Sequence, residues 1–527
     1  MAIRSLARTP DVRFQKVEDV SPRGPGVVAS RATSPGSGDH TPPANPSGEL
    51  HNVLAIANGT HPTHFEGIKK LHFIGIGGVG MSGIAQMCLE QGLQVSGSDM
   101  KESETTRRLR SKGARICKGH AADNIQDTEV VIISSAIRAE NPELAAAQER
   151  GLPVRKRAEL LGWLMAGKVG IAVAGAHGKT TTTSLTSWLL EQGGFDPTLI
   201  VGGEAVNTKN NVRFGQSPYL VAEADESDAS FLLLPARIAI VTNIDDDHLD
   251  FYGSFERLVE VFERFINRID PAGYVVLCTD NVQLRQMLPK VQVPCVTYGL
   301  QQPADYSADQ IDCGPNSSKF RLLVHGEPAG HFELSVPGLH NVQNALAAIA
   351  VAKNVGVEQH ALARGLSTFK GVKRRYQFIG EQAGIRVFDD YAHHPTEIAA
   401  TLASVRLAHP RRLVVLFQPH RYTRTELLAP SFARSFHDAD VVLLMPVYSA
   451  GEALRDGVTT DLIYQHMVQG HPYVLQIAGG QDHSRLLPLI ASQLERGDYV
   501  MTVGAGDVNQ VGQLLLEYLG RREAESR

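Results

Sequence analysis

The loop Gly175–Thr181, with the sequence Gly-Ala-His-Gly-Lys-Thr-Thr, carries the clearest chemical signature in the chain. It follows an apolar run that begins at Val169 and precedes the helical pattern Thr182–Gln192. Glycines allow backbone N–H groups to converge on phosphate oxygens, and a helix N-terminus adds the positive end of its dipole. Lys179 can reach the outer phosphates, and Thr180 offers a hydroxyl to Mg²⁺. The loop is a shorter variant of GxxxxGK[ST], and it predicts a triphosphate-binding site.

Two acidic clusters, Glu223–Asp228 and Asn243–Asp250, each follow an apolar run that is typical of a buried strand. Either cluster alone is typical of a solvated loop. A bound triphosphate, however, needs a metal ion and oxygen ligands, and α/β sheets place such groups at the ends of their strands. Together with the phosphate loop, the clusters predict a metal site, for which composition favours Asp247 over His248 because Mg²⁺ prefers oxygen.

A second glycine-rich turn, Gly75–Gly80, follows the apolar run that starts at Leu71. It has the spacing G-x-G-x-x-G, and Asp99 follows about 20 residues later, which is the pattern of a dinucleotide-binding turn. Only about 95 residues separate this strand from the phosphate loop, enough for about one mononucleotide-binding half. A nicotinamide cofactor and the diphosphate of a substrate therefore both remain possible occupants.

The composition narrows the class of protein. Lys and Arg number 51 against 56 Asp and Glu, a formal net charge of −5, so nothing indicates sequence-independent nucleic-acid binding. The five cysteines are scattered without CxxC spacing, which favours neither disulfides nor structural zinc and fits a reducing cytoplasm. The longest apolar runs are far shorter than the ~18 residues that a membrane span needs.

These elements must be positioned by a larger fold, and the chain of 527 residues is long enough for three domains. From Leu71 onward, short apolar runs alternate with longer helical patterns, which predicts an α/β fold with mainly parallel sheets. The polar stretch Asp305–Pro337 is expected to be a small antiparallel excursion. Strands are predicted at Leu71–Ile76, Gln94–Gly97, Val130–Ser134, Val169–Gly175, Tyr219–Ala224, Ala239–Ile244, Tyr274–Cys278, Arg412–Phe417, Val441–Met445 and Tyr499–Gly504.

The domain boundaries follow from restarts of this pattern. A Pro/Gly-rich tail at residues 1–65 lacks the apolar content to order itself and is predicted to be disordered. The three domains are predicted at residues 66–165, 166–371 and 372–527.

The motifs occur together, and in the same order, in a known family. They are Gly75–Met81, Gly175–Thr181, Glu223–Phe231, Thr242–Asn243, Asp247–His248, Pro337–Ala345, Arg374–Arg375, Asp389–Glu397 and Gln418–Thr425. Over about residues 68–521 the chain resembles the Mur ligases of peptidoglycan synthesis, most closely the members that add L-alanine to UDP-N-acetylmuramate.

The resemblance implies the fold and the activity. The first domain would be Rossmann-like and bind the UDP-substrate, the central domain would be a P-loop ATPase-like domain that binds ATP, and the C-terminal ligase domain would again be Rossmann-like. The implied reaction is an ATP-dependent and Mg²⁺-dependent ligation through an acyl phosphate, carried out by a monomer or homodimer in the bacterial cytoplasm. No nucleic-acid partner and no membrane insertion are implied.

The resemblance also implies the site residues. The UDP-substrate would contact Gly75, Gly77, Gly78, Gly80, Met81, Ser82 and Asp99. ATP would contact Gly175, Ala176, His177, Gly178, Lys179, Thr180, Thr181, His340 and Asn344. The metal ligands would be Thr180, Glu223 and His248, and the catalytic residues Lys179, Glu223, His248 and Arg375. The C-terminal domain would contribute Tyr391, His393, His394, His420, Arg421 and Arg424 next to the sugar carboxylate and the amino acid.

Several alternatives remain at this stage. Ala176 and Ala392 stand where the family usually has Thr and Gly. By residue type alone, His393 and His394 are equally typical of an ordinary loop before a helix, and Arg421 and Arg424 of a solvated helix start. The rival functions are a related ligase that recycles L-alanyl-γ-D-glutamyl-meso-diaminopimelate, a nicotinamide oxidoreductase, and a non-catalytic nucleotide switch.

Overall fold

The structure is a computed structural model, and it describes residues 50, 53–54, 65–134, 136–468, 470–471, 473–476 and 486–525. Most of the predicted disordered tail lies outside these residues. At its C-terminal end the prediction differs from the structure, because Leu50 and Val53 are helical and buried and Phe65 is also buried. These three apolar side chains join the core cluster, and their burial favours an ordered conformation for them.

The first domain is built on a parallel five-stranded sheet in the order β3-β2-β1-β4-β5. The order reverses between β1 and β4, so a crevice opens beyond the carboxyl end of β1, where the turn Gly75–Gly80 follows. The strands are β1 (Lys70–Ile74), β2 (Gln94–Asp99), β3 (Arg115–Lys118), β4 (Val130–Ile133) and β5 (Val154–Lys156). The helices are α2 (Val79–Glu90), α3 (Glu104–Ser111), α4 (Pro142–Glu149) and α5 (Arg157–Met165).

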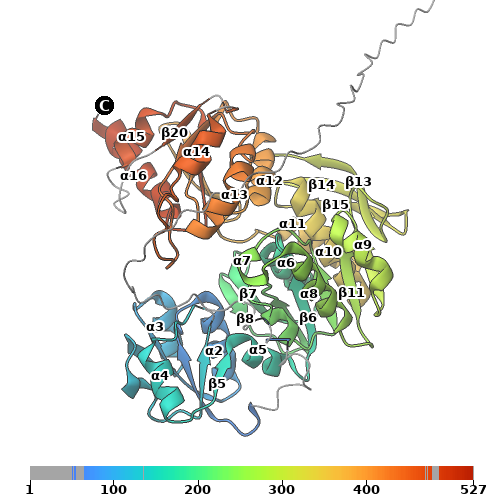
Figure 1. Cartoon of the computed structure of the whole chain (residues 1–527). Helices are drawn as coiled ribbons and strands as arrows, with labels where there is room; N and C mark the ends of the chain where they lie inside the picture. Colours follow the sequence, from blue (N-terminus) through green and yellow to red (C-terminus); the bar gives the residue numbers. More distant parts are fainter. Residues whose placement is uncertain are drawn as a thin grey trace, which may run out of the picture. The chain divides into compact units, whose positions relative to one another are not determined.

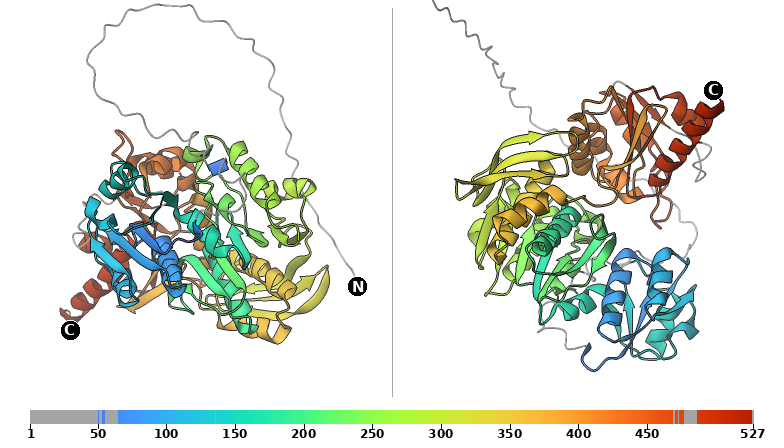
Figure 2. Two further views of the ribbon diagram at one scale, coloured as in Figure 1. Left: turned by 90° about the horizontal axis from the view of Figure 1, so that it is seen from below. Right: turned by 180° about the vertical axis from the view of Figure 1, so that it is seen from behind.

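The central domain contains a ten-stranded sheet in the order β15-β14-β13-β12-β11-β10-β6-β9-β7-β8. Its middle is parallel, while β13–β15 pair in antiparallel fashion and form one end of the sheet, drawn in yellow in Figures 1 and 2. The antiparallel excursion predicted at Asp305–Pro337 is thereby confirmed. The strands are β6 (Val169–Ala174), β7 (Thr198–Ala205), β8 (Asn210–Arg213), β9 (Tyr219–Glu223), β10 (Ile238–Val241), β11 (Tyr274–Cys278), β12 (Cys295–Tyr298), β13 (Tyr306–Cys313), β14 (Ser318–Val324) and β15 (Glu327–Leu334). The longer helices are α6 (Lys179–Gln192), α8 (Phe255–Asn267), α10 (Leu339–Val355) and α11 (Gln359–Thr368).

The C-terminal domain has a six-stranded sheet in the order β16-β17-β21-β18-β19-β20. In β18, Leu413 and Val415 join one buried cluster while Val414 and Leu416 join another, so helices cover both faces and the strand is apolar throughout. The strands are β16 (Gln377–Gln382), β17 (Ile385–Asp390), β18 (Arg412–Phe417), β19 (Val441–Leu444), β20 (Val474–Gln476) and β21 (Asp498–Val503). The helices include α12 (Pro395–Arg406), α13 (Tyr422–Arg434), α14 (Asp461–Met467), α15 (Leu487–Ser492) and α16 (Asn509–Glu525).

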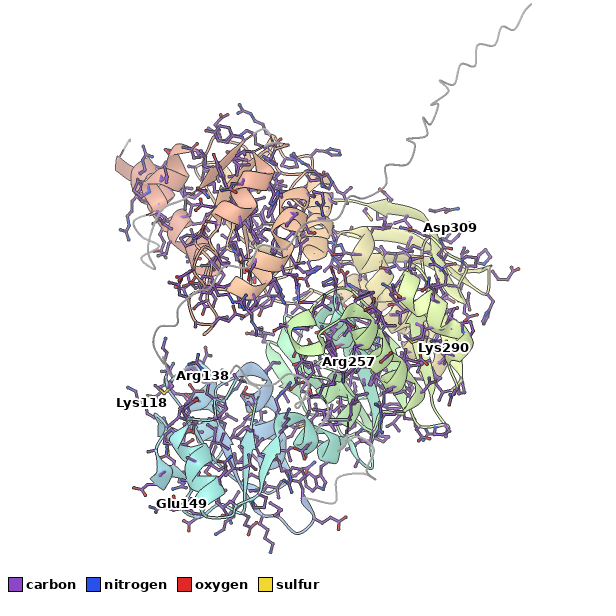
Figure 3. The ribbon with its side chains drawn as sticks, in the orientation of Figure 1. Lys118, Arg138, Glu149, Arg257, Lys290 and Asp309 are labelled. Atoms are coloured by element: carbon purple, nitrogen blue, oxygen red, sulfur yellow. The ribbon has the colours of Figure 1, made fainter. Side chains whose placement is uncertain are left out.

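The three sheets confirm the α/β class, and each predicted strand overlaps an observed one. The sheets occupy residues 70–156, 169–334 and 377–503. Charged side chains such as Lys118, Glu149 and Lys290 are exposed and project from the ribbon (Figure 3). Among the helices of the described residues, none has the length and apolar content for crossing a membrane.

Candidate active site

The phosphate loop passes from the end of β6 into α6 through two glycines with positive φ. Gly175 has φ 130° and Gly178 has φ 81°, conformations that L side chains rarely adopt. A Cβ atom on Gly178 would stand 2.5 Å from Oδ1 of Asn344, on α10. The loop therefore packs directly against the helix that also carries His340.

Lys179, the first residue of α6, is folded back over its own loop. Its Nζ donates to the backbone oxygens of Gly175 at 2.6 Å and Ala176 at 3.0 Å, and to Oε1 of Glu226 at 2.7 Å. Burial favours a lower pKa for Lys179, but the facing carboxylates of Glu226 and Glu223 outweigh it and raise that pKa. Burial also raises the pKa of Glu226 to about 7. The loop thus holds a charged ammonium group where the outer phosphates of a nucleotide would lie.

The expected metal ligands line one cavity beside Lys179. Thr180 Oγ1 donates to Glu223 Oε1 at 3.1 Å, and the other oxygen of Glu223 accepts from the backbone N–H of Gly202 at 2.7 Å. His248 has φ 58°, and its Nε2 lies 3.8 Å from Glu226 Oε1. The second oxygen of Glu226 is buried and has no hydrogen-bond partner among the described residues. This oxygen-rich set fits a Mg²⁺ ion.

Asp247, the residue that composition favours as a metal ligand, forms an ion pair with a residue of the C-terminal domain. Its Oδ1 accepts from Arg424 of α13 at 2.7 Å. Burial opposes ionisation of Asp247, but His248 and Arg424 outweigh it and hold the pKa of this carboxyl well below its usual range. Asp247 and His248 line the same cavity, and Arg424 engages one carboxylate oxygen of Asp247.

Three cavities adjoin this region. The α10 cavity, of about 550 Å³, is lined by residues that include Thr180, Thr181, His340, Asn344, Arg375 and Ser404. The loop cavity, of about 650 Å³, is lined by residues that include Lys179, Glu223, Asp247, His248, Tyr391 and His393. The glycine-turn cavity, of about 460 Å³, is lined by residues that include Gly75, Gly78, Gly80, Met81, Asp99 and Lys179.

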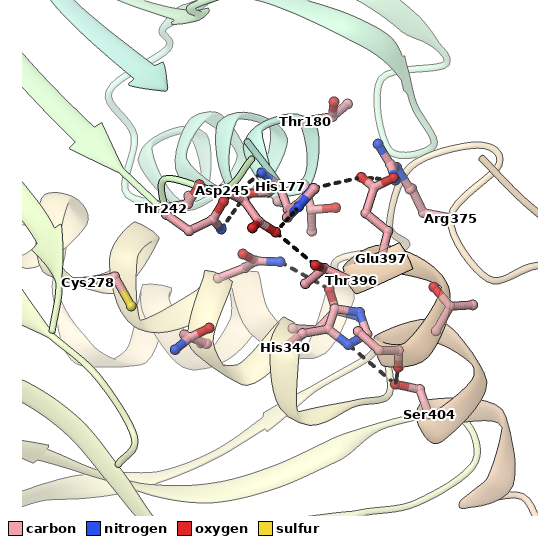
Figure 4. A pocket seen from close by; sticks show the side chains of 18 of the residues that line it. His177, Thr180, Thr242, Asp245, Cys278, His340, Arg375, Thr396, Glu397 and Ser404 are labelled. Carbon is pink, nitrogen blue, oxygen red and sulfur yellow. Dashed lines mark hydrogen bonds and ion pairs between the residues drawn. The ribbon is translucent and has the colours of Figure 1, made fainter. Parts of the chain in front are cut away.

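The α10 cavity is lined by a buried imidazole, that of His340, and by a cationic side chain, that of Arg375 (Figure 4). Burial, and next the charge of Arg375, lowers the pKa of His340 to about 4, so His340 is neutral at physiological pH. Its Nδ1 lies 3.3 Å from Ser404 Oγ. The neutral ring of His340 and the amide of Asn344 suit an uncharged heterocycle such as the base of a nucleotide, while the charge of Arg375 suits the phosphates of that nucleotide.

The C-terminal residues that the sequence analysis names divide into three groups of two. Tyr391 and His393 line the loop cavity. Arg421 and Arg424 line a small hollow of about 40 Å³ next to Asp247. His394 and His420 line neither this hollow nor any of the three cavities. His420 stacks on Tyr448 with ring centroids 5.7 Å apart, and His394 packs on His177 with ring centroids 4.8 Å apart.

The glycine turn of the first domain is stabilised by its own acidic residue. Asp99 Oδ2 accepts from the backbone N–H of Gly77 at 2.9 Å. Ser82 is buried, and neither it nor Gly77 is among the residues that line the glycine-turn cavity. Arg157 does line it and donates to Asp225 of the central domain at 3.3 Å. The cavity therefore extends from the glycine turn to the phosphate loop.

Sequence reasoning missed Glu397 as a site residue. Its Oε1 lies 3.5 Å from His177 Nδ1 and accepts from Arg375 at 3.4 Å, while Oε2 accepts from the backbone N–H of His393 at 3.1 Å. Burial opposes its ionisation, but His393 and Arg375 outweigh it and hold the pKa of Glu397 far below its usual range. Its place one helical turn after His393 was the available signal. Arg157, which lines the glycine-turn cavity, was missed too, and the sequence offers no signal for it other than its charge.

A phosphate loop that opens onto three cavities, in a chain of three α/β domains, defines a multidomain enzyme that uses a nucleoside triphosphate. The chain belongs to the Mur ligase family. Its residues 70–169 match the Mur ligase family catalytic domain, 173–352 the Mur ligase middle domain, and 374–506 the Mur ligase glutamate ligase domain.

Curated relatives of high similarity share one name. The UDP-N-acetylmuramate--L-alanine ligase of Geobacter sp. (strain M21) is 48% identical over 85% of this chain and 97% of its own length. The protein of the same name from Solibacter usitatus (strain Ellin6076) is 48% identical over 86% of this chain and 95% of its own length.

Solved structures agree with this similarity. The UDP-N-acetylmuramate-alanine ligase of Thermotoga maritima matches with a TM-score of 0.71 and 30% identity, over 87% of this chain and 100% of its own. A murein peptide ligase of Psychrobacter arcticus matches with a TM-score of 0.65 and 26% identity, over 86% and 99%. A MurF ligase of Thermotoga maritima in complex with ADP, at 16% identity and a TM-score of 0.57, shares the fold.

Proposed function

We propose that this protein ligates L-alanine to the lactyl carboxylate of UDP-N-acetylmuramate, converting ATP to ADP and phosphate, as a step of peptidoglycan synthesis in the bacterial cytoplasm. The observation that carries this proposal is the position of Lys179, which lines both the loop cavity and the glycine-turn cavity. One ammonium group thus adjoins the space for a diphosphate substrate and the space for a nucleotide's outer phosphates. The 46–48% identity to curated alanine ligases supports the choice of amino acid.

Each domain has a part in the proposal. The first domain, 66–165, offers the glycine-turn cavity to UDP, and the central domain, 166–371, offers the phosphate loop and α10 to ATP. The C-terminal domain, 372–527, offers Arg375 to the phosphates and places Tyr391 and His393 in the loop cavity. The substrate carboxylate and the γ-phosphoryl group then meet beside Lys179.

The reaction needs ATP because an amide cannot form until a carboxylate oxygen becomes part of a leaving group. The lactyl carboxylate attacks the γ-phosphoryl group to give an acyl phosphate and ADP, and the amine of L-alanine then displaces phosphate. Lys179 and Arg375 supply positive charge to this transfer, and the cavity walls hold the reactants in line. Neither step requires a covalent enzyme nucleophile, because the substrate carboxylate and the amine of L-alanine are the attacking groups.

Thr180, Glu223 and His248 would hold Mg²⁺. The ion would neutralise charge on the phosphates when bound. Glu226 lines the same cavity, and its Oε2 is buried without a hydrogen-bond partner among the described residues, so it offers one more oxygen there. Thr180 contacts Glu223 directly, so two of the three proposed ligands lie side by side.

The test is ADP formation measured against a panel of amine substrates. ADP release that requires both UDP-N-acetylmuramate and L-alanine supports the proposal. Release with L-alanyl-γ-D-glutamyl-meso-diaminopimelate in place of L-alanine would favour a murein peptide ligase, a class that the Psychrobacter structure represents at only 26% identity. ATP binding with no amide product would leave only a nucleotide switch, and a substrate-dependent change in nicotinamide absorbance would favour an oxidoreductase.

A further inference from the structure

Two histidines and one aspartate converge at the border of the α10 cavity. His177 comes from the phosphate loop, Asp245 follows β10, and His394 is the N-cap residue of α12. One ligand-type atom from each lies within 4.8 Å of the others. The Nε2 of His177 is 2.9 Å from Asp245 Oδ2, and the Nδ1 of His394 is 3.7 Å from the same oxygen. Figure 4 shows His177 and Asp245 side by side, linked to each other.

Both rings direct their opposite nitrogen at a second carboxylate. The Nδ1 of His177 is 3.5 Å from Glu397 Oε1, and the Nε2 of His394 is 3.6 Å from Asp246 Oδ1. Histidines that bind metal ions almost always donate their other N–H to a carboxylate, carbonyl or water, which fixes the ring and its tautomer. In each ring, the nitrogen opposite Asp245 therefore has a carboxylate oxygen within ion-pair distance, from Glu397 and from Asp246 respectively.

The burial of His394 gives an independent reason to assign a ligand here. Its side chain is only 3% exposed. Its Nε2, which faces Asp246 and not Asp245, has no hydrogen-bond partner among the described residues. Its Nδ1 accepts from the backbone N–H of Thr396 at a long 3.4 Å. The proposed ligand atom of this buried ring, Nδ1, thus makes only one long hydrogen bond, which leaves most of its capacity for another partner.

The geometry points to a site for a transition-metal dication of the Zn²⁺ class, ligated by His177 Nε2, Asp245 and His394 Nδ1. Two imidazoles and one carboxylate are preferred by Zn²⁺, Co²⁺ and Ni²⁺, whereas Mg²⁺ takes oxygen ligands. Bonds of about 2 Å in tetrahedral geometry place ligand atoms about 3.3 Å apart, a spacing that the observed separations bracket.

This site differs from the proposed Mg²⁺ site in residues and in consequence. Its ligands come from the central and the C-terminal domains, so a bound ion cross-links the phosphate loop to α12. His177 and Asp245 also line the α10 cavity, so an ion that they ligate would lie beside the proposed ATP site. Micromolar Zn²⁺ is therefore expected to slow turnover, because a cross-link between two domains hinders their relative movement, and such movements limit the turnover of many enzymes.

The direct test uses Co²⁺ as a spectroscopic probe on the full-length protein without nucleotide or substrate. Mg²⁺ is kept in excess to occupy oxygen-ligand sites, and Co²⁺ is titrated while its visible ligand-field absorption is recorded. His394→Asn is the variant of choice, because asparagine retains an N-cap acceptor for α12. His248→Asn is the matched control, since it removes the histidine beside the proposed Mg²⁺ site. Thermal unfolding verifies that each variant folds.

The expected result is a nitrogen-ligand spectrum at one equivalent of Co²⁺, displaced by Zn²⁺, with affinity lowered about tenfold or more by His394→Asn and unchanged by His248→Asn. If His394→Asn does not fold, Asp245→Asn replaces it with the same expectation. Unchanged Co²⁺ affinity in a folded His394 or Asp245 variant overturns the inference, as does loss of the spectrum in His248→Asn. Because no substrate is present, this outcome is independent of the proposed ligase activity.

Discussion

Replacing Lys179 with methionine tests the chemistry of the phosphate loop, because methionine keeps much of the volume and removes the charge. A cation about 4 Å from a phosphoryl oxygen contributes about 4 kcal/mol at the effective dielectric constant near a protein surface. Losing that contribution in the transition state lowers the rate about a thousandfold. We therefore expect Lys179→Met to reduce kcat for ADP formation by about three orders of magnitude.

The effect on stability is expected to be smaller, for a reason that the structure supplies. Removing one partner of a buried ion pair usually costs about 3–5 kcal/mol. Glu226, the partner of Lys179, has its pKa raised to about 7, so it can take up a proton when the ammonium is gone. A neutral carboxyl leaves only an imperfect hydrogen-bond arrangement, and we expect a loss of about 1–2 kcal/mol near pH 7.

The pH dependence of stability follows from the same carboxyl. Its pKa is higher in the folded protein than the ordinary 4.5, so the folded state binds its proton more tightly than the unfolded state. Stability is therefore greatest below about pH 4.5 in this respect and falls as the pH rises towards 7. In Lys179→Met the pKa rises further, so the decline should continue above pH 7. Urea unfolding between pH 5 and about pH 9 measures it.

The matched control is the double variant Lys179→Met/Glu226→Gln. The neutral amide should remove the added pH dependence and recover part of the lost stability, yet turnover should stay low because the phosphates still lack their cation. Turnover near that of the unaltered protein in Lys179→Met would refute the assignment of Lys179. Recovery of turnover in the double variant would show that an unpaired carboxylate, and not the missing cation, had caused the loss.

Three further variants test other parts of the site and fold. Gly178→Ala places a methyl group 2.5 Å from Asn344 Oδ1 at a backbone φ of 81°, so we expect the KM for ATP to rise about tenfold; an unchanged KM would contradict the packing of the loop on α10. Arg424→Met removes the 2.7 Å contact to Asp247 from a side chain that is 9% exposed, and should lower kcat/KM about a hundredfold, whereas an effect on unfolding alone would make the contact structural. Glu143 is buried, yet hydrogen bonds outweigh the effect of burial and lower its pKa to about 2. Its ionised form therefore stabilises the fold above pH 4.5 by up to about 3 kcal/mol, and this contribution disappears as the pH falls to about 2. Glu143→Gln should flatten that part of the urea-unfolding profile, and an unchanged acid profile would refute the role.

The sequence predicted strands well where burial on both faces makes them apolar throughout, as in β18. It missed β17, Ile385–Asp390, because a charged residue interrupts its apolar run and the strand ends in two aspartates. It also missed β5, which spans only Val154–Lys156 and has two basic residues. Short or partly polar strands depend on neighbours in the sheet that a local pattern does not contain.

The site was predictable where chemistry and chain order coincide, as in the phosphate loop. It was not predictable where distant segments meet. Glu397 binds both His177 and Arg375 only because α12 lies against the phosphate loop, more than 200 positions earlier in the chain. His393 and His394 are adjacent in sequence, yet they face the loop cavity and the Asp245 cluster respectively, because the backbone turns into α12 between them and Pro395.

The most direct test of the central claim follows an oxygen atom. UDP-N-acetylmuramate with ¹⁸O in its lactyl carboxylate is incubated with the protein, ATP, Mg²⁺ and L-alanine, and the products are analysed by mass spectrometry. An acyl-phosphate route transfers one carboxylate oxygen to the released phosphate and leaves the other in the amide of UDP-N-acetylmuramoyl-L-alanine. Unlabelled phosphate, or ADP formation without this amide, would contradict the account.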